Sequence, residues 1–160
     1  QHTISPSMDI QVASNFERLI FNIFSNNSSK TSELMKDLNK KGEFKLENNE
    51  IKKILENFIS ESLSENETKL AIKEVYDKEK ILIDPHTAIG FGVVKKISLK
   101  DKTIILSTAH PSKFPDVVRR ESGVNPELPE NLSGILNEKE KYDILPNDLK
   151  TIKDYVLKKI

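Results

Sequence analysis

Two short blocks in the second half of the chain combine side chains of the kind that bind ligands and transfer protons. In the block Thr103–His110, the apolar run Ile104–Leu106 gives way abruptly to small and polar residues. The block Asp84–Gly90 begins with an acid and contains a histidine. A buried strand delivers polar side chains in this way to a cleft at its C-terminal end, where open α/β sheets bind their ligands. The two blocks therefore predict a ligand-binding cleft.

Each polar residue of these blocks also has a purely structural interpretation. The Thr108 hydroxyl, at the end of the predicted strand, can cap a turn or bond to a neighbouring carbonyl. His110 can be a hydrogen-bonded structural histidine, although an imidazole titrates near neutrality and suits acid–base chemistry. Asp84 stands before Pro85 and His86 and can cap the N-terminus of a helix. The residues alone leave both interpretations open at all three positions.

Neither a metal centre nor a phosphate-binding loop is predicted. His86 and His110 face each other if the two blocks line one cleft, but a metal site needs a third ligand. The sequence has no His-x₃-His or Glu-x-x-His pair, and its five glycines are scattered. A phosphate loop needs clustered glycines between a strand and a helix. From the residues alone we predict the ligand-binding portion of an α/β protein.

Apolar residues at helical spacing predict most of the elements that position these blocks. A helix starts at about Ser14, as its N-cap, and ends before the polar run 26–29. Residues 27–80 are rich in Lys, Glu and Asn and are expected to form a helical insertion with a packing and spacing role only. Within it, Ser64–Glu67 matches a capping box. The elements expected after it are short strands at 81–83 and 103–108, helices at 85–96 and 116–121, and a last helix capped by Asn147.

The composition excludes several classes of function. Twenty-five basic and twenty-five acidic residues cancel, so no electrostatic surface for nucleic acid or for an anionic membrane is expected. No apolar run approaches the roughly 20 residues that a membrane helix needs. The absence of cysteine excludes disulfides and thiolate ligands and favours the cytoplasm. The chain begins with Gln1 and has no signal-peptide pattern, and we expect it to be a piece of a longer protein.

Four motifs, in this order along the chain, resemble the C-terminal third of threonine synthase, of the long type found in bacteria and fungi. The motifs are Ser5–Ile10, Ser14–Arg18, Asp84–Gly90 and Leu106–Phe114. Four separate motifs in order are more specific than any one of them. The resemblance covers nearly the whole chain, although residues 27–80 and those after Gly123 match only in pattern.

The resemblance implies an α/β enzyme of the tryptophan-synthase-β-like fold (fold type II) that uses pyridoxal 5'-phosphate. Such enzymes convert O-phospho-L-homoserine and water into L-threonine and phosphate. In that family the hydroxyl residue of the Ser-Thr-Ala-His block approaches the pyridine nitrogen of the cofactor, a role that falls here to Thr108. A neutral hydroxyl, unlike a carboxylate, does not enforce a protonated pyridine. The other residues implied at the cofactor are Ser107, Asp84, His86 and Thr87, and those implied near the substrate or behind the cofactor are His110, Met8, Asp9 and Arg18.

The resemblance also divides the chain into three parts. Residues 1–26 supply a strand end and a helix of the large cofactor-binding domain, residues 27–80 the helical insertion, and residues 81–160 the C-terminal part of the large domain with a few parallel strands. For Arg18, which lies on an amphipathic helix, a surface pair is the structural alternative.

The resemblance leaves no catalytic residue in this segment. The family's Schiff-base lysine lies in a Phe-Lys-Asp context and its cofactor phosphate lies in a Gly/Asn loop, and neither pattern occurs here. Both are expected upstream in the same polypeptide. We therefore expect the isolated chain to be inactive. We also expect it to be only marginally stable, because the strand 103–108 would lack partners along its edge. The alternatives are a relative of the same fold with a different substrate and a non-enzymatic scaffold fragment.

Overall fold

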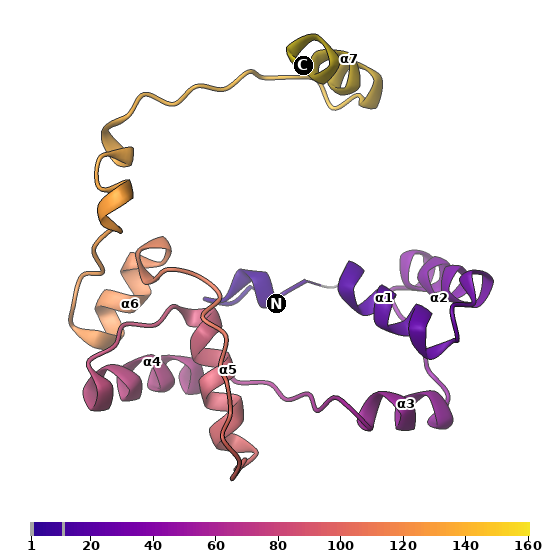
Figure 1. Ribbon diagram of the computed structural model, residues 1–160, viewed down its shortest axis with the longest axis horizontal. Helices are drawn as coiled ribbons and strands as arrows, with labels where there is room; N and C mark the ends of the chain where they lie inside the picture. The colour runs from indigo at the N-terminus through magenta and orange to yellow at the C-terminus, as the bar shows by residue number, and fades with distance from the viewer. Residues whose placement is uncertain (1, 11) are drawn as a thin grey trace. The chain divides into compact units, whose positions relative to one another are not determined.

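The computed structural model describes residues 2–10 and 12–160, which form helices and connections in two compact units (Figure 1). The boundary between the two units in the sequence follows Pro126. Within those ranges the first unit contains η1 (Pro6–Met8), α1 (Ser14–Ile23), α2 (Ser28–Lys41), α3 (Asn48–Leu55), α4 (Glu65–Glu79), α5 (Pro85–Lys96), η2 (Pro111–Lys113) and α6 (Pro115–Ser122). The second unit contains η3 (Glu130–Leu132), η4 (Ile135–Asn137) and α7 (Leu149–Lys159).

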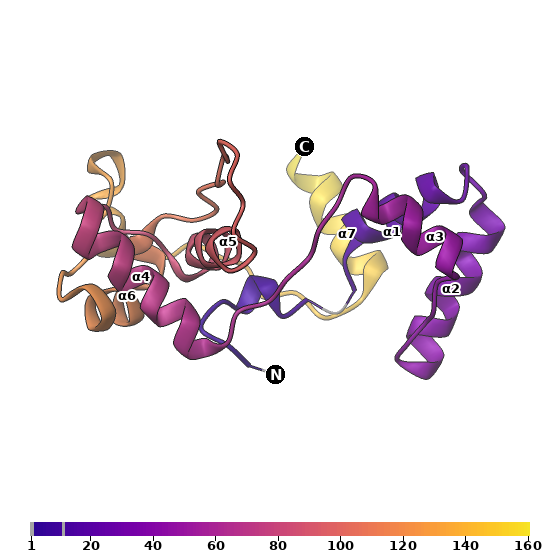
Figure 2. The same cartoon turned by 90° about the horizontal axis from the view of Figure 1, so that it is seen from below.

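Helices α1, α2 and α3 pack against one another (Figure 2). The predicted break between α1 and α2 is confirmed, since Asn26 adopts a left-handed backbone with φ of 64° and the Asn27 side chain caps α2. The expected N-cap of α1 is wrong by one residue. Ala13 is the N-cap, because its carbonyl accepts the first helical hydrogen bonds, and Ser14 is already helical with no side-chain cap. Glu50, which is buried, pairs with Lys30 and so joins α3 to α2.

The core of the first unit lies between α4, α5 and α6 (Figure 1). The predicted capping box is present at the start of α4: the Ser64 hydroxyl accepts the Glu67 N–H, and the Glu67 carboxylate accepts the Ser64 N–H at 2.6 Å. Small and β-branched side chains let the three helices approach closely. The buried residues of this core are Ala71, Ile72, Ala88, Val117 and Val118. Because α5 is anchored in this core, the residues at its N-terminus are held in place.

The described residues contain no β-strand. The sequence predicted strands at 81–83 and 103–108, and the second was expected to be buried, but Ile104 is 90% exposed and Leu106 is 75% exposed. A strand forms only when its backbone groups pair with those of a neighbouring strand. These two segments have no such neighbouring strand within residues 2–10 and 12–160. The apolar side chains of 104–106 therefore remain on the surface of this chain.

The second unit ends in α7, whose N-cap is Asp148, one residue after the expected Asn147. The Asp148 carboxylate accepts the N–H of Thr151 at 2.8 Å. An aspartate and an asparagine cap about equally well, and here the chain enters the helix one residue later than expected. In the part of the chain that the structure describes, no helix is both long and apolar enough to cross a membrane.

Candidate functional site

Asp84 lies at the centre of the polar cluster that the two sequence blocks build. It is fully buried and caps α5. One carboxylate oxygen accepts the backbone N–H of His86 at 2.9 Å and lies 2.7 Å from its ring Nδ1. The other accepts the backbone N–H of Thr87 at 3.2 Å and the Thr87 hydroxyl. The structural interpretation of Asp84 as a helix N-cap is thus confirmed.

These contacts keep the Asp84 carboxylate ionised inside the protein. Burial raises its pKa, but hydrogen bonds from Thr87 and His86 favour the charged form and outweigh burial, so the net pKa lies below the ordinary value. The N-terminus of α5 adds the positive end of a helix dipole beside this charge. The cluster therefore contains a buried anion that is stabilised by hydrogen-bond donors.

His86 is a neutral imidazole with both ring nitrogens in use. Its Nε2 accepts the backbone N–H of Ser7 at 3.2 Å, and an amide can only donate, so Nε2 carries a lone pair. The ring proton is then on Nδ1 and is donated to Asp84. The ring also packs against Phe114, with 4.8 Å between the ring centroids. His86 is buried and joins η1, α5 and the segment after η2.

Thr87 brings the two sequence blocks together. Its hydroxyl oxygen accepts the backbone N–H of Thr108 at 3.1 Å and lies 3.3 Å from the Thr108 hydroxyl. Thr87 is buried, whereas Thr108 is exposed. The blocks 84–90 and 103–110 thus lie in contact at these two threonines, and that they line one ligand site stays a prediction.

The hydrogen bonds of this cluster leave the Thr108 hydroxyl able to donate to a ligand that has an acceptor atom. The single hydroxyl hydrogen of Thr87 is used on the Asp84 carboxylate, so only Thr108 can donate across the contact between the two hydroxyls. That contact is long for an O–H···O hydrogen bond. The Thr108 hydroxyl can therefore donate outward to a lone pair, such as that of an unprotonated pyridine nitrogen.

The remaining predicted cofactor and histidine positions lie outside the hydrogen bonds of Asp84 and Thr87. Ser107 is exposed, and its side chain takes part in none of the hydrogen bonds found in the described residues. His110 is also exposed, and its Nδ1 accepts the backbone N–H of Ser112 at 3.3 Å and lies 2.7 Å from the Ser112 hydroxyl. His110 caps η2. His110 thus bonds to its own turn, and its role near the substrate stays a prediction.

Three positions that the resemblance placed near the substrate lie on the N-terminal part of the chain. Met8 ends η1, next to the amide that His86 binds, and is half-exposed. Asp9 accepts the backbone N–H of Thr3 at 3.0 Å and its hydroxyl at 2.9 Å, which closes a local turn. Arg18 is an exposed residue of α1 and lines a hollow between α1 and α2. Of the three, the structure links only Met8, through its neighbour, to the polar cluster.

Sequence reasoning did not predict two contacts of His86 in this cluster. The Ser7 amide and the Phe114 ring enclose His86, and both residues fall within the motifs that carry the family resemblance. A contact made by a backbone amide does not depend on the residue type, so it cannot be predicted from a residue pattern. Only the presence of Ser7 and Phe114 in the family motifs indicated that they lie near the site. No group of three or more His, Asp or Glu residues is placed to hold a metal ion in the described parts of the chain.

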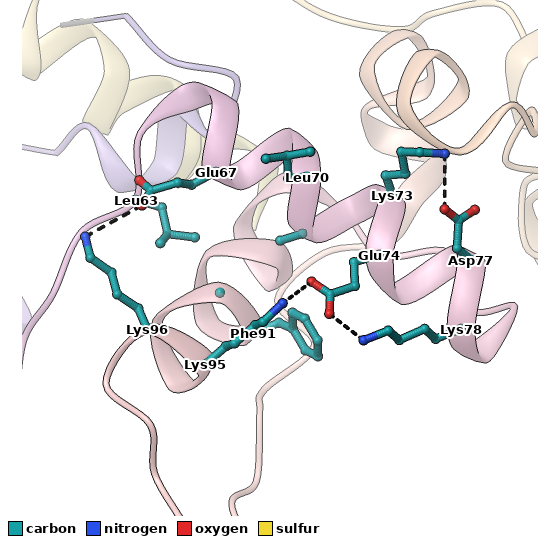
Figure 3. A pocket seen from close by; sticks show the side chains of 12 residues that line it. Leu63, Glu67, Leu70, Lys73, Glu74, Asp77, Lys78, Phe91, Lys95 and Lys96 are labelled. Carbon is teal, nitrogen blue, oxygen red and sulfur yellow. Dashed lines mark hydrogen bonds and ion pairs between the residues drawn. The ribbon is translucent and has the colours of Figure 1, made fainter.

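A groove of about 660 Å³ lies between α4 and α5, away from this cluster (Figure 3). Its floor includes Leu63 and Phe91. The charged groups on its rim pair with one another: Glu74 accepts both Lys78 at 2.7 Å and Lys95 at 2.5 Å, and these hydrogen bonds lower the pKa of Glu74. The charged side chains of the groove are thus paired with one another, whereas the exposed Thr108 has a hydroxyl that can donate to a ligand.

Comparisons with known proteins agree with the motifs. The family model "Threonine synthase, C-terminal" matches residues 87–156, which include both Thr87 and Thr108. Threonine synthase of Pseudomonas aeruginosa is 36% identical over 157 residues, which cover 96% of this chain and 34% of that protein. The chain belongs to the threonine synthase family. It corresponds to the C-terminal segment of threonine synthase and spans about a third of the length of the curated relatives that it matches.

Two solved threonine synthases share this fold. The crystal structure of pyridoxal-phosphate-bound threonine synthase from Brucella melitensis matches with a TM-score of 0.81 at 38% identity, over 98% of this chain and 34% of that one. The yeast enzyme matches with a TM-score of 0.77 at 30% identity, over 100% of this chain and 37% of that one. The chain therefore has the fold of part of a threonine synthase.

Proposed function

We propose that this chain is the C-terminal part of a working threonine synthase of fold type II, which converts O-phospho-L-homoserine and water into L-threonine and phosphate with pyridoxal 5'-phosphate. Family membership and the pyridoxal-phosphate-bound relative support the enzyme class. The observation that carries the proposal is the exposed Thr108 hydroxyl, held by the buried Thr87 and Asp84. In the motif Leu106–Phe114, this is the hydroxyl that the family resemblance assigns to the cofactor.

In this proposal Thr108 donates a hydrogen bond to the pyridine nitrogen of the cofactor. When bound, pyridoxal phosphate supplies an electron sink for negative charge that develops on the substrate. A hydroxyl at the ring nitrogen leaves the ring unprotonated, so it moderates that sink. Behind Thr108, the Asp84 carboxylate holds Thr87 and His86 in place through hydrogen bonds to their backbone and side-chain donors.

His86 has a supporting role in this proposal. Because both of its ring nitrogens are bonded, it has no nitrogen free for a proton transfer. It fixes the backbone of η1 beside the N-terminus of α5, and it thereby sets the position of Met8 on the substrate side. Ser107 and His110 complete the exposed loop around Thr108, while Asp9 closes the turn before α1.

The rest of the site belongs, in this proposal, to an upstream segment of the same polypeptide. That segment supplies the lysine that binds the cofactor, the loop for its phosphate, and the strands that pair with residues 81–83 and 103–108. The exposed apolar side chains of Ile104 and Leu106 support this, since burial against such a sheet removes them from water. The chain alone is then inactive. The cytoplasm is the compartment that we propose, on the ground of the cysteine-free composition.

The proposal is tested by measuring phosphate and threonine released from O-phospho-L-homoserine by the complete protein with pyridoxal phosphate. The variants are Thr108→Val and, as a matched control, Thr103→Val, which removes an exposed hydroxyl bonded to the Asp101 carbonyl in the same loop. Loss of one hydrogen bond to the ring predicts a fall of about three- to tenfold for Thr108→Val and no change for Thr103→Val. Cofactor binding without phosphate release would favour a relative with another substrate, and no cofactor binding would favour a scaffold.

A further inference from the structure

We propose that Thr87 is a positioning residue that aligns Thr108 and commits the Thr108 hydroxyl to donating toward the cofactor. The inference rests on the function proposed above, because it concerns the residue behind the one that meets the ring. It goes further by assigning a direction to every hydrogen of the cluster.

The hydroxyl hydrogen of Thr87 has one destination. A hydroxyl carries one hydrogen and two lone pairs, and the Thr87 hydroxyl lies in hydrogen-bond contact with a carboxylate oxygen of Asp84. An ionised carboxylate can only accept. The lowered pKa of Asp84, which results from hydrogen bonds that outweigh burial, keeps that carboxylate ionised. Thr87 therefore donates to Asp84 and has no hydrogen left for Thr108.

The lone pairs of Thr87 hold Thr108 by its backbone. The Thr108 N–H donates to the Thr87 hydroxyl oxygen at 3.1 Å, and the two residues are 21 positions apart in the sequence. This bond fixes the main chain of residue 108, and with it the place from which the Thr108 side chain leaves. Since Thr87 is 7% exposed, any effect of its hydroxyl on a ligand passes through Thr108.

The Thr108 hydroxyl is left with a weak partner inside the protein and a free direction outside it. Its oxygen lies 3.3 Å from that of Thr87, beyond the usual range of about 2.5–3.0 Å for such bonds. Thr108 is the only possible donor in that contact. A ligand nitrogen with a lone pair is a better acceptor at shorter range, so the hydroxyl hydrogen turns toward the ligand without breaking a strong bond.

The test uses the complete protein with pyridoxal phosphate labelled with ¹⁵N at the ring nitrogen. Thr87→Val keeps the shape of the side chain and removes its hydroxyl, whereas Thr87→Ser keeps the hydroxyl. Thr68→Val is the matched control, because it removes another buried hydroxyl, bonded to the Ser64 carbonyl in α4. Thr108→Val defines the signal of a ring nitrogen without its donor. The readouts are the ¹⁵N shift of the ring and hydrogen exchange at the Thr108 amide.

We expect Thr87→Val to speed exchange of the Thr108 amide by about three- to tenfold, the change that loss of one hydrogen bond gives. We also expect it to move the ring signal toward that of Thr108→Val. Thr87→Ser and Thr68→Val should match the wild type in both readouts. A merely structural role for Thr87 would move the melting temperature in Thr87→Val and Thr68→Val alike and leave the ring signal unchanged.

The failures of the two proposals are distinguishable. If Thr108→Val leaves the ring signal unchanged, Thr108 does not meet the ring, and both the proposed function of Thr108 and this inference are overturned. If Thr108→Val moves the signal and Thr87→Val does not, only the inference is overturned. A neutron structure of the wild-type protein tests it without any substitution. The Thr87 hydrogen is expected to point at Asp84, and a hydrogen that points at Thr108 would overturn the inference.

Discussion

Replacing Asp84 by alanine removes one carboxylate that serves four hydrogen-bond donors. Two are backbone N–H groups at the start of α5, at 2.9 Å and 3.2 Å, and two are the side chains of His86 and Thr87. The substitution leaves these donors in a region where Asp84 is fully buried and His86 is 4% exposed. Water has little access to replace the lost acceptor, so we expect a large loss of stability.

The magnitude follows from the two kinds of donor. Loss of a helix N-cap costs about 1 kcal/mol. Each buried side-chain donor left without an acceptor costs about 1–3 kcal/mol more. Together they predict that Asp84→Ala lowers the free energy of unfolding by about 3–7 kcal/mol. The matched control is Ser64→Ala at the N-cap of α4, where the side chain accepts one exposed backbone N–H, and we expect it to cost about 1 kcal/mol.

The assay is equilibrium unfolding of the complete protein in urea, followed by circular dichroism at a wavelength that reports helix. Both substitutions lie in the same unit of the chain and both shorten a capping residue to alanine, so their difference isolates the buried side-chain donors. A loss for Asp84→Ala that is no larger than that for Ser64→Ala would refute the reasoning. It would mean that His86 and Thr87 find other acceptors or water.

Three further predictions concern pH, the core and a helix end. Burial raises the pKa of Asp84, but the hydrogen bonds that it accepts lower the pKa by more, so the folded pKa lies below the unfolded value. The stability that Asp84 adds to the folded protein should therefore be complete above the unfolded pKa of about 3.9 and should disappear as the pH falls through the lower folded pKa. An acid titration of stability that is identical for wild type and Asp84→Asn would contradict this. Ile72, 1% exposed between α4, α5 and α6, should cost about 2–5 kcal/mol when replaced by alanine, as measured by urea unfolding, with the exposed Leu70 as the control. Gly42 ends α2 with a φ of 78° and open space around it, so Gly42→Ala should cost about 1 kcal/mol through backbone strain alone. Gly134→Ala, at a negative φ and with equal space, should cost less, and equal melting temperatures would count against the strain.

Local signals in the sequence predicted most helices of this chain. The capping box at Ser64 and the N-cap at Asp84 each depend on a few neighbouring residues, and the structure has both. The N-cap of α7 was misplaced by one residue because Asn147 and Asp148 cap a helix about equally well. The N-cap of α1 was misplaced because Ala13, which has no side-chain acceptor, precedes the helix, so capping preference did not decide that start. The exact first turn is then decided by how the chain enters the helix.

The two predicted strands could not be settled from local signals. Residues 103–108 have the composition of a buried strand, but burial and pairing depend on other segments of chain, and Ile104 and Leu106 are exposed here. The division into residues 1–26, 27–80 and 81–160 likewise stays a prediction. Helix α4, from the predicted insertion, packs against α5 and α6, so it shares the core that holds the site.

The candidate site was predictable in its members and less so in its contacts. The motifs brought Asp84, Thr87 and Thr108 to attention, and the structure places them in one hydrogen-bonded cluster. The partner of His86 was not predictable, since the Ser7 amide lies 79 positions away and contributes only backbone. That contact occupies Nε2 of His86, and Asp84 occupies Nδ1, so neither ring nitrogen is free for proton transfer.

The most direct test of the central proposal is a crystal structure of the complete protein with pyridoxal phosphate bound. The quantity to measure is the distance from the Thr108 hydroxyl oxygen to the pyridine nitrogen. We predict a hydrogen bond of about 2.6–3.0 Å, with Thr87 still accepting the Thr108 N–H. A different residue at the ring nitrogen, or a Thr108 hydroxyl beyond hydrogen-bond distance, would contradict the account.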